Sequence, residues 1–213
     1  MIVMVNIFLV LTVSNNISSS VSLSVVILAA GGSSRFGRLK QLFKFKRKSL
    51  LKHIVEKALK LQCKEILVVH GSKAAQCQRE IFSCDTINII NERWKTGISS
   101  SLILAIDSIS VDSQAILILL CDQPLISYFQ LKRLVKLWKQ YPKKIIASKY
   151  GNTVGVPVIL PREYFKEVKK LKGDMGAKKI ISDFSKNRIL MRIPEAAFDI
   201  DNKKDFSDLL ARK

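Results

Sequence analysis

A loop rich in glycine and serine, with two basic residues, is the stretch of this sequence best suited to binding phosphate groups. The loop follows an apolar run, opens at Gly31 and contains Arg35 and Lys40. Glycines let the backbone approach a ligand without interference from Cβ, and successive N–H groups can form an anion-binding concavity. Fixed positive charge suits a triphosphate. The alternative is an ordinary surface turn, and the glycine spacing is that of neither a Walker loop nor a dinucleotide-binding fingerprint.

A single carboxylate, Asp122, follows a second all-apolar run at residues 115–120. Ligands of open α/β sheets bind outside the carboxyl ends of the strands, which is where this side chain would lie. Carboxylate oxygens are hard ligands that suit Mg²⁺ held between protein and phosphates. Asp122 is therefore our strongest candidate for a metal ligand. The alternative is that it caps the helix predicted at residues 127–140.

Apolar periodicity predicts the elements that must position these side chains. Runs rich in Val, Ile and Leu predict strands, and apolar residues at helical spacing predict amphipathic helices. Strands alternate with helices and no internal repeat is evident, which predicts one α/β domain with a mostly parallel sheet and a short antiparallel insertion. The predicted strands are residues 25–28, 65–70, 86–90, 115–120, 144–150, 154–160 and 188–193, and the predicted helices are 49–61, 73–82, 127–140, 161–171 and 203–210, with one more opening at serines 99–101.

Composition limits the partners of this chain. It has 213 residues, enough for one domain with a sizeable core, and a formal net charge of +19 from 36 Lys and Arg against 17 Asp and Glu. Such a balance is compatible with nucleic acid, a membrane surface or small anionic substrates. The lysines are spread along the chain and are not interleaved with aromatic residues, which argues against a nucleic-acid module. An anionic nucleotide substrate fits the charge, as does a solvated lysine-rich surface.

The cysteines and the N-terminal segment bear on the compartment. The four cysteines include no C-x-x-C pair, which argues against zinc and disulfide frameworks and favours reduced thiols in the cytoplasm. Residues 1–13 are apolar but shorter than the roughly 20 residues of a transmembrane helix, and no basic residue precedes them. We expect residues 1–22 to be an extension, either from a mis-set start codon or as an extra element packed on the domain, and residues 23–213 to be the domain.

The loop also carries a family resemblance. It resembles the signature of the MobA-like nucleotidyltransferases, in the form Leu28-Ala29-Ala30-Gly31-x-Ser33-x-Arg35-x-Gly37-x-x-Lys40. The resemblance runs from about residue 25 to residue 210, and within the family it is strongest to the molybdenum cofactor cytidylyltransferases. Phe36 stands where the family often has Met. The resemblance implies a Rossmann-like, three-layer nucleotidyltransferase domain.

Besides the loop, the resemblance implies a second nucleotide-binding segment. Residues 91–102 are similar to an N-x-x-W-x-x-G-x-S-x-S-L segment that helps bind the nucleotide in the cytidylyltransferase branch. The Gly-Pro-containing segment of the guanylyltransferase branch is missing, which favours CTP. From the residues alone, the serines could equally cap the helix that follows. The implied nucleotide-binding residues are Leu28, Ala29, Ala30, Gly31, Gly32, Ser33, Ser34, Arg35, Lys40, Asn91, Gly97, Ser99 and Ser101.

The resemblance further implies a metal site and an acceptor site. Cys121-Asp122-Gln123-Pro124 is similar to the family's metal-binding motif, and Asp201 in a D-I-D segment would supply a second carboxylate to Mg²⁺. The residues after Asp201 depart from the usual Thr-Pro-Glu-Asp, although Asp199 and Asp201 are both present. A G-x-P-V segment and a G-D-x-G-A loop, for which a plain turn between helices is the alternative, would bind the acceptor. The implied acceptor-binding residues are Gly155, Pro157, Gly173, Asp174 and Gly176.

The activity implied by the resemblance is transfer of CMP from CTP to molybdopterin-type molybdenum cofactor, which yields the cytosine dinucleotide cofactor and pyrophosphate. Arg35, Lys40 and Asp122 would be the catalytic residues, and a molybdoenzyme could receive the product. We expect no nucleic-acid or membrane partner. Two alternatives stay open: cytidylyl or guanylyl transfer to a sugar or alditol phosphate, and a non-catalytic chaperone that delivers the cofactor.

Overall fold

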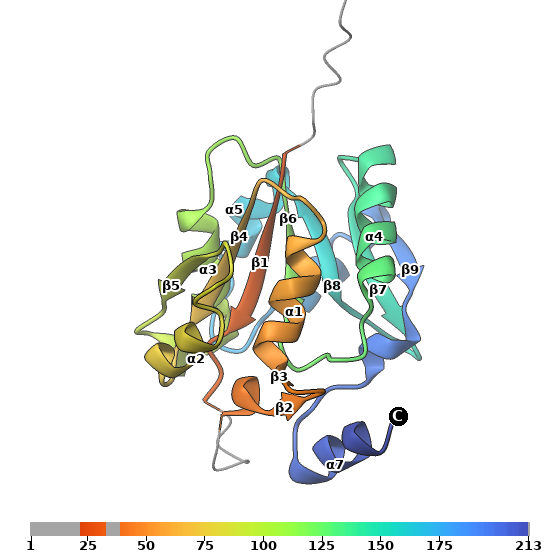
Figure 1. Ribbon diagram of the computed structural model, residues 1–213. Helices are drawn as coiled ribbons and strands as arrows, with labels where there is room; N and C mark the ends of the chain where they lie inside the picture. The colour runs from red at the N-terminus through yellow and green to blue at the C-terminus, as the bar shows by residue number, and fades with distance from the viewer. Residues whose placement is uncertain (1–21, 33–38, 213) are drawn as a thin grey trace, which may run out of the picture.

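A seven-stranded sheet forms the frame of the protein, whose computed structural model describes residues 22–32 and 39–212 (Figure 1). The strand order is β5-β4-β1-β6-β8-β7-β9. Neighbours from β5 to β6 are parallel, as are β7 and β9, whereas β8 runs antiparallel between β6 and β7. The predicted, mostly parallel sheet with an antiparallel insertion is confirmed. The strands are β1 Leu23–Ala29, β4 Glu65–His70, β5 Ile87–Ile90, β6 Ala115–Leu120, β7 Ile145–Tyr150, β8 Thr153–Pro161 and β9 Arg188–Arg192.

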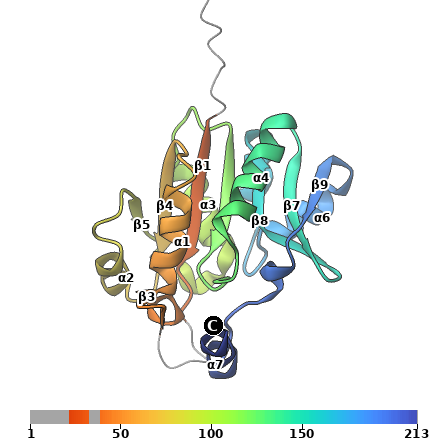
Figure 2. The same ribbon diagram turned by 45° about the vertical axis from the view of Figure 1, so that its right-hand side comes forward.

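Helices cover both faces of the sheet and complete the three predicted layers (Figure 2). On one face, α1 Leu50–Leu59 and α4 Tyr128–Gln140 bury side chains such as Val55 and Trp138. On the other face, α3 Ile98–Ser108 buries Leu102 beside residues of α5 and α6. The other helices are α2 Ala74–Glu80, α5 Phe165–Val168, α6 Ala177–Asp183 and α7 Lys203–Ala211, and the 3-10 turns are η2 Lys40–Leu42, η3 Trp94–Thr96, η4 Arg162–Tyr164, η5 Ser185–Asn187 and η6 Pro194–Ala197.

The central strand β1 is buried along its whole length. Val25 and Ile27 pack in the layer of α1 and α4, whereas Val26 and Leu28 pack in the layer of α3. A strand covered on both faces has no solvated face, so its sequence is a nearly continuous apolar run and does not alternate. Burying each Val, Leu or Ile side chain contributes roughly 1.5–3 kcal/mol. The turn after β1 therefore leaves from a rigid support.

The order in which the strands are added places the ends of β1 and β6 side by side. After β1 the chain adds β4 and β5 on one side, then returns to add β6 on the other side. Leu28 pairs with Leu120, close to the carboxyl end of both strands. Ligands of open α/β sheets bind in the crevice at such a switch of direction. The switch between β1 and β6 is thus the expected place of the site.

Some local elements differ from the sequence-based expectation. The helix expected at residues 161–171 is present only in part: Pro161 pairs with Ala115 and ends β8, η4 follows, and the α-helix is limited to the short α5. Proline is tolerated at a strand end because no ladder hydrogen bond is lost there. The short α6 is an additional helix, and β2 Lys44–Phe45 and β3 Lys48–Ser49 form an additional hairpin. Its turn has positive φ at Lys46 and Arg47 without the Asn-Gly or Asp-Gly signal that normally marks such a turn.

The expected N-terminal extension, residues 1–22, lies outside the described residues except for Ser22. Over the two described ranges, no helix has the length and apolar character needed to cross a bilayer.

A buried polar cluster joins β1, β4 and the turn before β6 at the amino edge of the sheet. Glu65 Oε1 accepts hydrogen bonds from Ser24 Oγ at 2.7 Å and from Ser113 Oγ at 3.2 Å, and from Ser110 N at 2.8 Å. Ser24 and Ser113 are both fully buried. An unpaired buried hydroxyl costs free energy, so this carboxylate stabilises the alignment of β1, β4 and the turn that leads into β6, at the edge opposite the switch.

Glu65→Ala should lower the free energy of unfolding by about 1–3 kcal/mol, because the buried hydroxyls of Ser24 and Ser113 would keep only their contact with each other and Ser110 N would lose its acceptor. Glu65→Gln keeps the Oε1 acceptor and should cost less. Urea denaturation measures both losses. Equal losses for the two variants would show that the hydrogen bonds of Glu65 are not what stabilises this edge.

Candidate active site

A cavity of about 360 Å³ opens at the switch between β1 and β6. Its walls come from the turn after β1, the turn after β6, η2, and the segment that leads into α3. Gln41 and Trp94 also line this cavity, although neither is among the nucleotide-binding residues implied by the sequence. The residues expected at the site that line this cavity are Leu28, Ala30, Gly31, Gly32, Lys40, Gly97, Ser101, Asp122 and Asp174.

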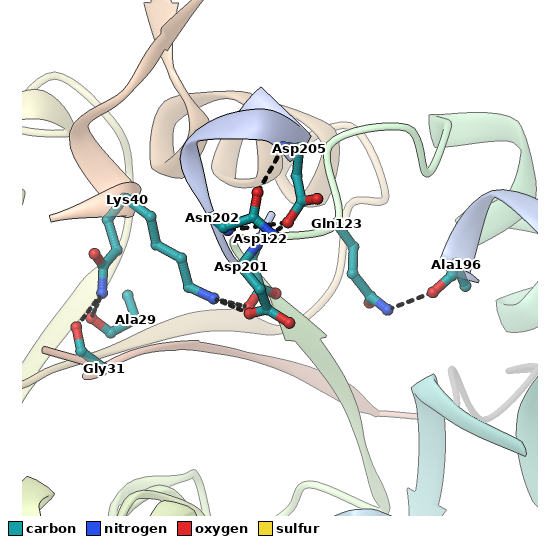
Figure 3. A network of polar contacts seen from close by, with 10 residues as sticks. Ala29, Gly31, Lys40, Asp122, Gln123, Ala196, Asp201, Asn202 and Asp205 are labelled. Atoms are coloured by element: carbon teal, nitrogen blue, oxygen red, sulfur yellow. Dashed lines mark hydrogen bonds and ion pairs between the residues drawn. The ribbon is translucent and has the colours of Figure 1, made fainter. Parts of the chain in front are cut away.

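Lys40 joins two carboxylates beside this cavity (Figure 3). Its Nζ lies 2.5 Å from Asp122 Oδ2 and 3.2 Å from Asp201 Oδ1. The side chains of Lys40 and Asp122 are only 16% and 17% exposed, whereas that of Asp201 is 61% exposed. Burial alone would lower the pKa of Lys40, but the charges of Asp122 and Asp201 outweigh burial and raise that pKa above its ordinary value. Lys40 is therefore a cation throughout the physiological pH range.

The C-terminal segment is fastened to the end of β6 by its backbone. Ile200 N donates a hydrogen bond to Asp122 O at 3.0 Å, and the Ile200 side chain is fully buried beside Leu50. This contact places Asp199 and Asp201, which flank Ile200, next to Asp122. Helix α7 begins immediately afterwards with a reciprocal capping box between Asn202 and Asp205 (Figure 3). Although the residues after Asp201 differ from the usual Thr-Pro-Glu-Asp, the segment that carries Asp201 is held on one side by the Ile200 hydrogen bond and on the other by the capping box of α7.

The carboxylates suit a divalent cation. Asp122 Oδ1 and Asp199 Oδ1 are buried, and neither has a hydrogen-bond partner within the described part of the chain. Burial, together with the charge of Asp122, raises the pKa of Asp199 to about 6. Carboxylate oxygens without hydrogen-bond partners are suitable ligands for a hard cation. A bound cation would contact these oxygens and reduce the repulsion between the carboxylates.

The protein alone would not complete the coordination shell of such a cation, so a bound substrate and water would have to supply further ligands. Among the described residues, no group of three His, Cys, Asp or Glu side chains is arranged to hold a metal ion. Mg²⁺ is commonly held by one or two carboxylates, with phosphates and water completing the shell. The alternative role of Asp122 as a helix cap is excluded, because Ser127 caps α4 in a capping box with Gln130.

Trp94 forms one wall of the cavity and depends on two glycines. A Cβ on Gly32 would lie 2.7 Å from the Trp94 ring. A Cβ on Gly71 would lie 2.8 Å from Trp94 Cβ and 2.4 Å from Ala30 O. The indole therefore packs directly on the backbone of the turn after β1, an approach that only glycine allows. The Trp of the N-x-x-W segment was the available sequence signal for this wall.

The serine cluster receives hydrogen bonds and does not cap α3. Gly97 is the N-cap residue, and no side chain caps the helix there. Asn91 Nδ2 donates to Ser100 Oγ at 2.8 Å and to Ser101 Oγ at 2.9 Å, which fastens the end of β5 to the start of α3. Ser99 faces a separate cavity behind this segment. Of the expected residues in this segment, Gly97 and Ser101 line the first cavity. Asn91 does not line it and contacts Ser101 through a hydrogen bond.

Three of the five expected acceptor residues line a cavity at this end of the sheet. Gly155 and Gly176 line a second cavity of about 230 Å³, and Asp174 lines both cavities. Gly173 and Pro157 line neither of them. Gly173 packs against Gly97, and Pro157 O accepts a hydrogen bond from Ser148 Oγ at 2.6 Å. Ala29 also lines neither cavity, and Ser33, Ser34 and Arg35 lie outside the described residues.

Residues 25–189 match the family described as the MobA-like NTP transferase domain. The chain belongs to this family. The predicted class, a nucleotidyltransferase domain, is thereby confirmed. The match ends before Asp199 and Asp201, so the role of the C-terminal carboxylates is supported by their position beside Asp122 and not by the family match.

Relatives of this chain have diverse names. Bifunctional protein GlmU from Buchnera aphidicola is 31% identical over 141 residues, which are 65% of this chain and 30% of that protein. Nicotine blue oxidoreductase from Paenarthrobacter nicotinovorans is 33% identical over 129 residues, which are 60% of this chain and 61% of that protein. The chain thus spans less than two thirds of either relative, and their names fix neither its substrate nor its acceptor.

Solved structures share the fold over almost the whole chain. Rv0371c from Mycobacterium tuberculosis has a TM-score of 0.79 at 24% identity, covering 89% of this chain and 98% of that one, and it has also been solved in complex with manganese. Molybdopterin-guanine dinucleotide biosynthesis protein A from Archaeoglobus fulgidus has a TM-score of 0.65 at 15% identity, covering 88% and 97% of the two chains. These likenesses confirm the Rossmann-like fold.

Gly97→Ala should lower the free energy of unfolding by at least about 2 kcal/mol. Gly97 has φ of 105° and ψ of 170°, a region open essentially to glycine alone, and an added Cβ would lie 2.2 Å from the carbonyl of Gly173. Gly151→Ala is the matched control: its φ is also positive, at 52°, but an added Cβ meets nothing within 4 Å, so it should cost only about 1–2 kcal/mol. Chemical denaturation of both variants tests this, and equal losses would contradict the close contact.

Lys40→Met should tighten the binding of Mn²⁺ to the nucleotide-free protein about fivefold, or ~1 kcal/mol, because the ammonium group no longer competes for Asp122 and Asp201. Electron paramagnetic resonance of free Mn²⁺ gives the dissociation constant. Lys179→Met, which removes an exposed i,i+4 pair with Asp183, is the control and should leave it unchanged. Unchanged or weaker binding by Lys40→Met would mean that Lys40 does not occupy the cation position.

Proposed function

We propose that this protein transfers the CMP part of CTP to molybdopterin-type molybdenum cofactor and releases pyrophosphate. The observation that carries the proposal is the position of Lys40, which lies between Asp122 and Asp201 beside a glycine turn at the switch point. This is the edge of the sheet at which open α/β proteins bind ligands. Here the ammonium group of Lys40 can give up its place between the carboxylates to a metal ion that arrives with the triphosphate. The match to the MobA-like NTP transferase domain supports the same class of reaction.

The reaction would proceed by in-line attack of the acceptor phosphate on the α-phosphate of CTP. One acceptor oxygen forms a bond to the α-phosphorus as the bond to the bridging oxygen of the β-phosphate breaks. A phosphate monoester is already anionic near neutral pH, so no protein base is required. The protein's contribution is positioning and charge neutralisation. Mg²⁺, held by Asp122 and Asp201, would supply charge neutralisation at the α-phosphate.

The chain's own basic residues act on the departing group. Lys40 would leave the two carboxylates and move its ammonium group to the β- and γ-phosphates, where it stabilises pyrophosphate as it leaves. Arg35 would add a second charge there. The backbone of Gly31 and Gly32, against which Trp94 packs, can approach the phosphates closely. Asp122 stays in place because its backbone carbonyl is held by Ile200 N.

Cytosine is the proposed base and a pterin phosphate the proposed acceptor. The segment from Asn91 to Ser101 resembles the cytidine-type segment, and Gly97 and Ser101 line the first cavity. The second cavity adjoins the first and is lined by Tyr150 and Asp174, whose ring and carboxylate suit a flat, polar heterocycle. The proposed compartment is the cytoplasm, where CTP is available, and a molybdoenzyme is the proposed recipient.

Two alternative functions predict different experimental results. A sugar or alditol phosphate acceptor would use the same phosphate chemistry, so only the identity of the product distinguishes it. A non-catalytic delivery chaperone would bind the cofactor and release no pyrophosphate. The complete arrangement of Lys40, Asp122 and Asp201 favours catalysis over delivery alone.

Incubation with equal concentrations of CTP and GTP, Mg²⁺ and molybdopterin-type cofactor, with products separated by mass, tests the proposal. The cytosine dinucleotide should prevail by at least tenfold, or about 1.4 kcal/mol in kcat/KM, because a site that hydrogen-bonds one base edge leaves polar groups unpaired against another. Asp122→Asn should abolish product formation, and Asp112→Asn, which removes only an exposed pair with Lys64, should not. Predominance of the guanine product would contradict the choice of base, and transfer to sugar phosphates alone would contradict the acceptor.

A further inference from the structure

We propose that Gln41 is a positioning residue for nucleotide binding, because its carboxamide orients the turn after β1 so that backbone N–H groups are left for phosphate oxygens. The inference rests on the proposed function and adds to it a residue that contacts neither the metal nor the reacting atoms. It concerns how the phosphate-binding turn acquires its shape.

The side chain of Gln41 is committed to this turn. Gln41 follows Lys40 in η2, and only 1% of the residue is exposed. Its Nε2 donates to Ala29 O at 3.0 Å and to Gly31 O at 2.6 Å, contacts that Figure 3 shows at the labelled Ala29 and Gly31. A primary amide nitrogen has two N–H donors, so both serve the turn.

Protein donors hold the carbonyls of three successive residues, Ala29 to Gly31, and Gln41 supplies the donors for the first and the third. Ala30 O, between the two carbonyls bound by Gln41, accepts a weaker hydrogen bond from Ser72 N at 3.4 Å. In a trans peptide the C=O of one residue and the N–H of the next point in opposite directions. Holding the carbonyls of Ala29 and Gly31 toward Gln41 therefore turns the N–H groups of Ala30 and Gly32 away from it.

The orientation of these peptides decides what a phosphate meets. Ala30 and Gly32 both line the cavity. An N–H group turned toward a phosphate oxygen donates a hydrogen bond, whereas a carbonyl in the same place presents partial negative charge and repels it. Without Gln41 the two carbonyls would lose their donors and the turn could rotate them toward the ligand.

Gln41 also connects the turn after β1 to Lys40 and its carboxylate partners. Within the η2 segment, Leu42 N donates a local hydrogen bond to Leu39 O at 3.1 Å. The side-chain bonds to Ala29 and Gly31 fasten η2 to β1, and the preceding residue, Lys40, reaches Asp122 from that support. One buried amide thus sets both the backbone and the cation that a triphosphate would contact.

Binding of Mg²⁺-CTP, followed by tryptophan fluorescence, provides the test and needs no acceptor. Trp94 lines the cavity and the only other tryptophan, Trp138, is buried in the core, so quenching reports on the site. Gln41→Leu removes both donors and should raise the dissociation constant of CTP at least tenfold. Gln41→Glu has the same size but faces two carbonyl oxygens, so it should bind poorly at pH 8. Relative to the wild type at each pH, it should recover partly toward pH 6, because a protonated carboxyl regains one donor.

Gln130→Leu is the matched control. The Gln130 amide also joins two elements, capping α4 and donating to Glu195, but it does not line the cavity. This variant should lower Tm and leave the dissociation constant of CTP unchanged. A lower Tm with wild-type affinity in Gln41→Leu would overturn the inference and make Gln41 a purely structural amide.

Two further outcomes keep the inference separable from the proposed function. If Gln41→Leu does not fold, Gln41→Glu decides, and wild-type affinity at pH 8 would overturn the inference. If the wild-type protein binds neither CTP nor GTP, the proposed function itself fails and the inference falls with it. Wild-type binding with no loss in either Gln41 variant contradicts the inference alone.

Discussion

Two carboxylates brought together at the end of a buried sheet require a positive charge between them, and the arrangement of this protein depends on that requirement. Asp122 and Asp199 would repel each other in an environment of low dielectric, and Lys40 lies where it offsets the charge of Asp122 and Asp201. Removing one partner from a partly buried group of charges leaves the others uncompensated. A positive charge beside these carboxylates is therefore stabilising. In our account Lys40 supplies it when the nucleotide is absent, and the metal ion supplies it when the nucleotide is bound.

The fold brings these groups together through three supports. The buried pairing of β1 with β6 places the glycine turn beside Asp122. The backbone bond from Ile200 to Asp122 returns the distant C-terminal segment to the same point. The amide of Gln41 fastens η2, and with it Lys40, to the end of β1. Each support is buried, so the charged groups themselves can exchange partners without loss of the scaffold.

Patterns within single segments made part of this structure predictable. The apolar runs of β1 and β6 indicated buried strands because a strand covered on both faces needs no polar residues, and the position of Asp122 after such a run indicated its place at the switch. Side-chain hydrogen bonds between one segment and the next could not be predicted in the same way. No local pattern specifies that Gln41 binds the carbonyls of Ala29 and Gly31, or that Asn91 donates to Ser100 and Ser101. The hairpin of β2 and β3 escaped prediction because Lys46 and Arg47 adopt positive φ without glycine or asparagine.

The most direct test of the central claim is the thermodynamic linkage between CTP and a divalent cation. If the cation takes the place of Lys40 between the carboxylates as the nucleotide binds, each ligand must raise the affinity for the other by the same factor. Isothermal titration of CTP in the presence of Mn²⁺ and of a chelator measures that factor. We predict at least a tenfold gain in CTP affinity with Mn²⁺ in the wild-type protein, and no gain in Asp122→Asn. Equal affinity of the wild-type protein for CTP with Mn²⁺ and with the chelator would contradict the account.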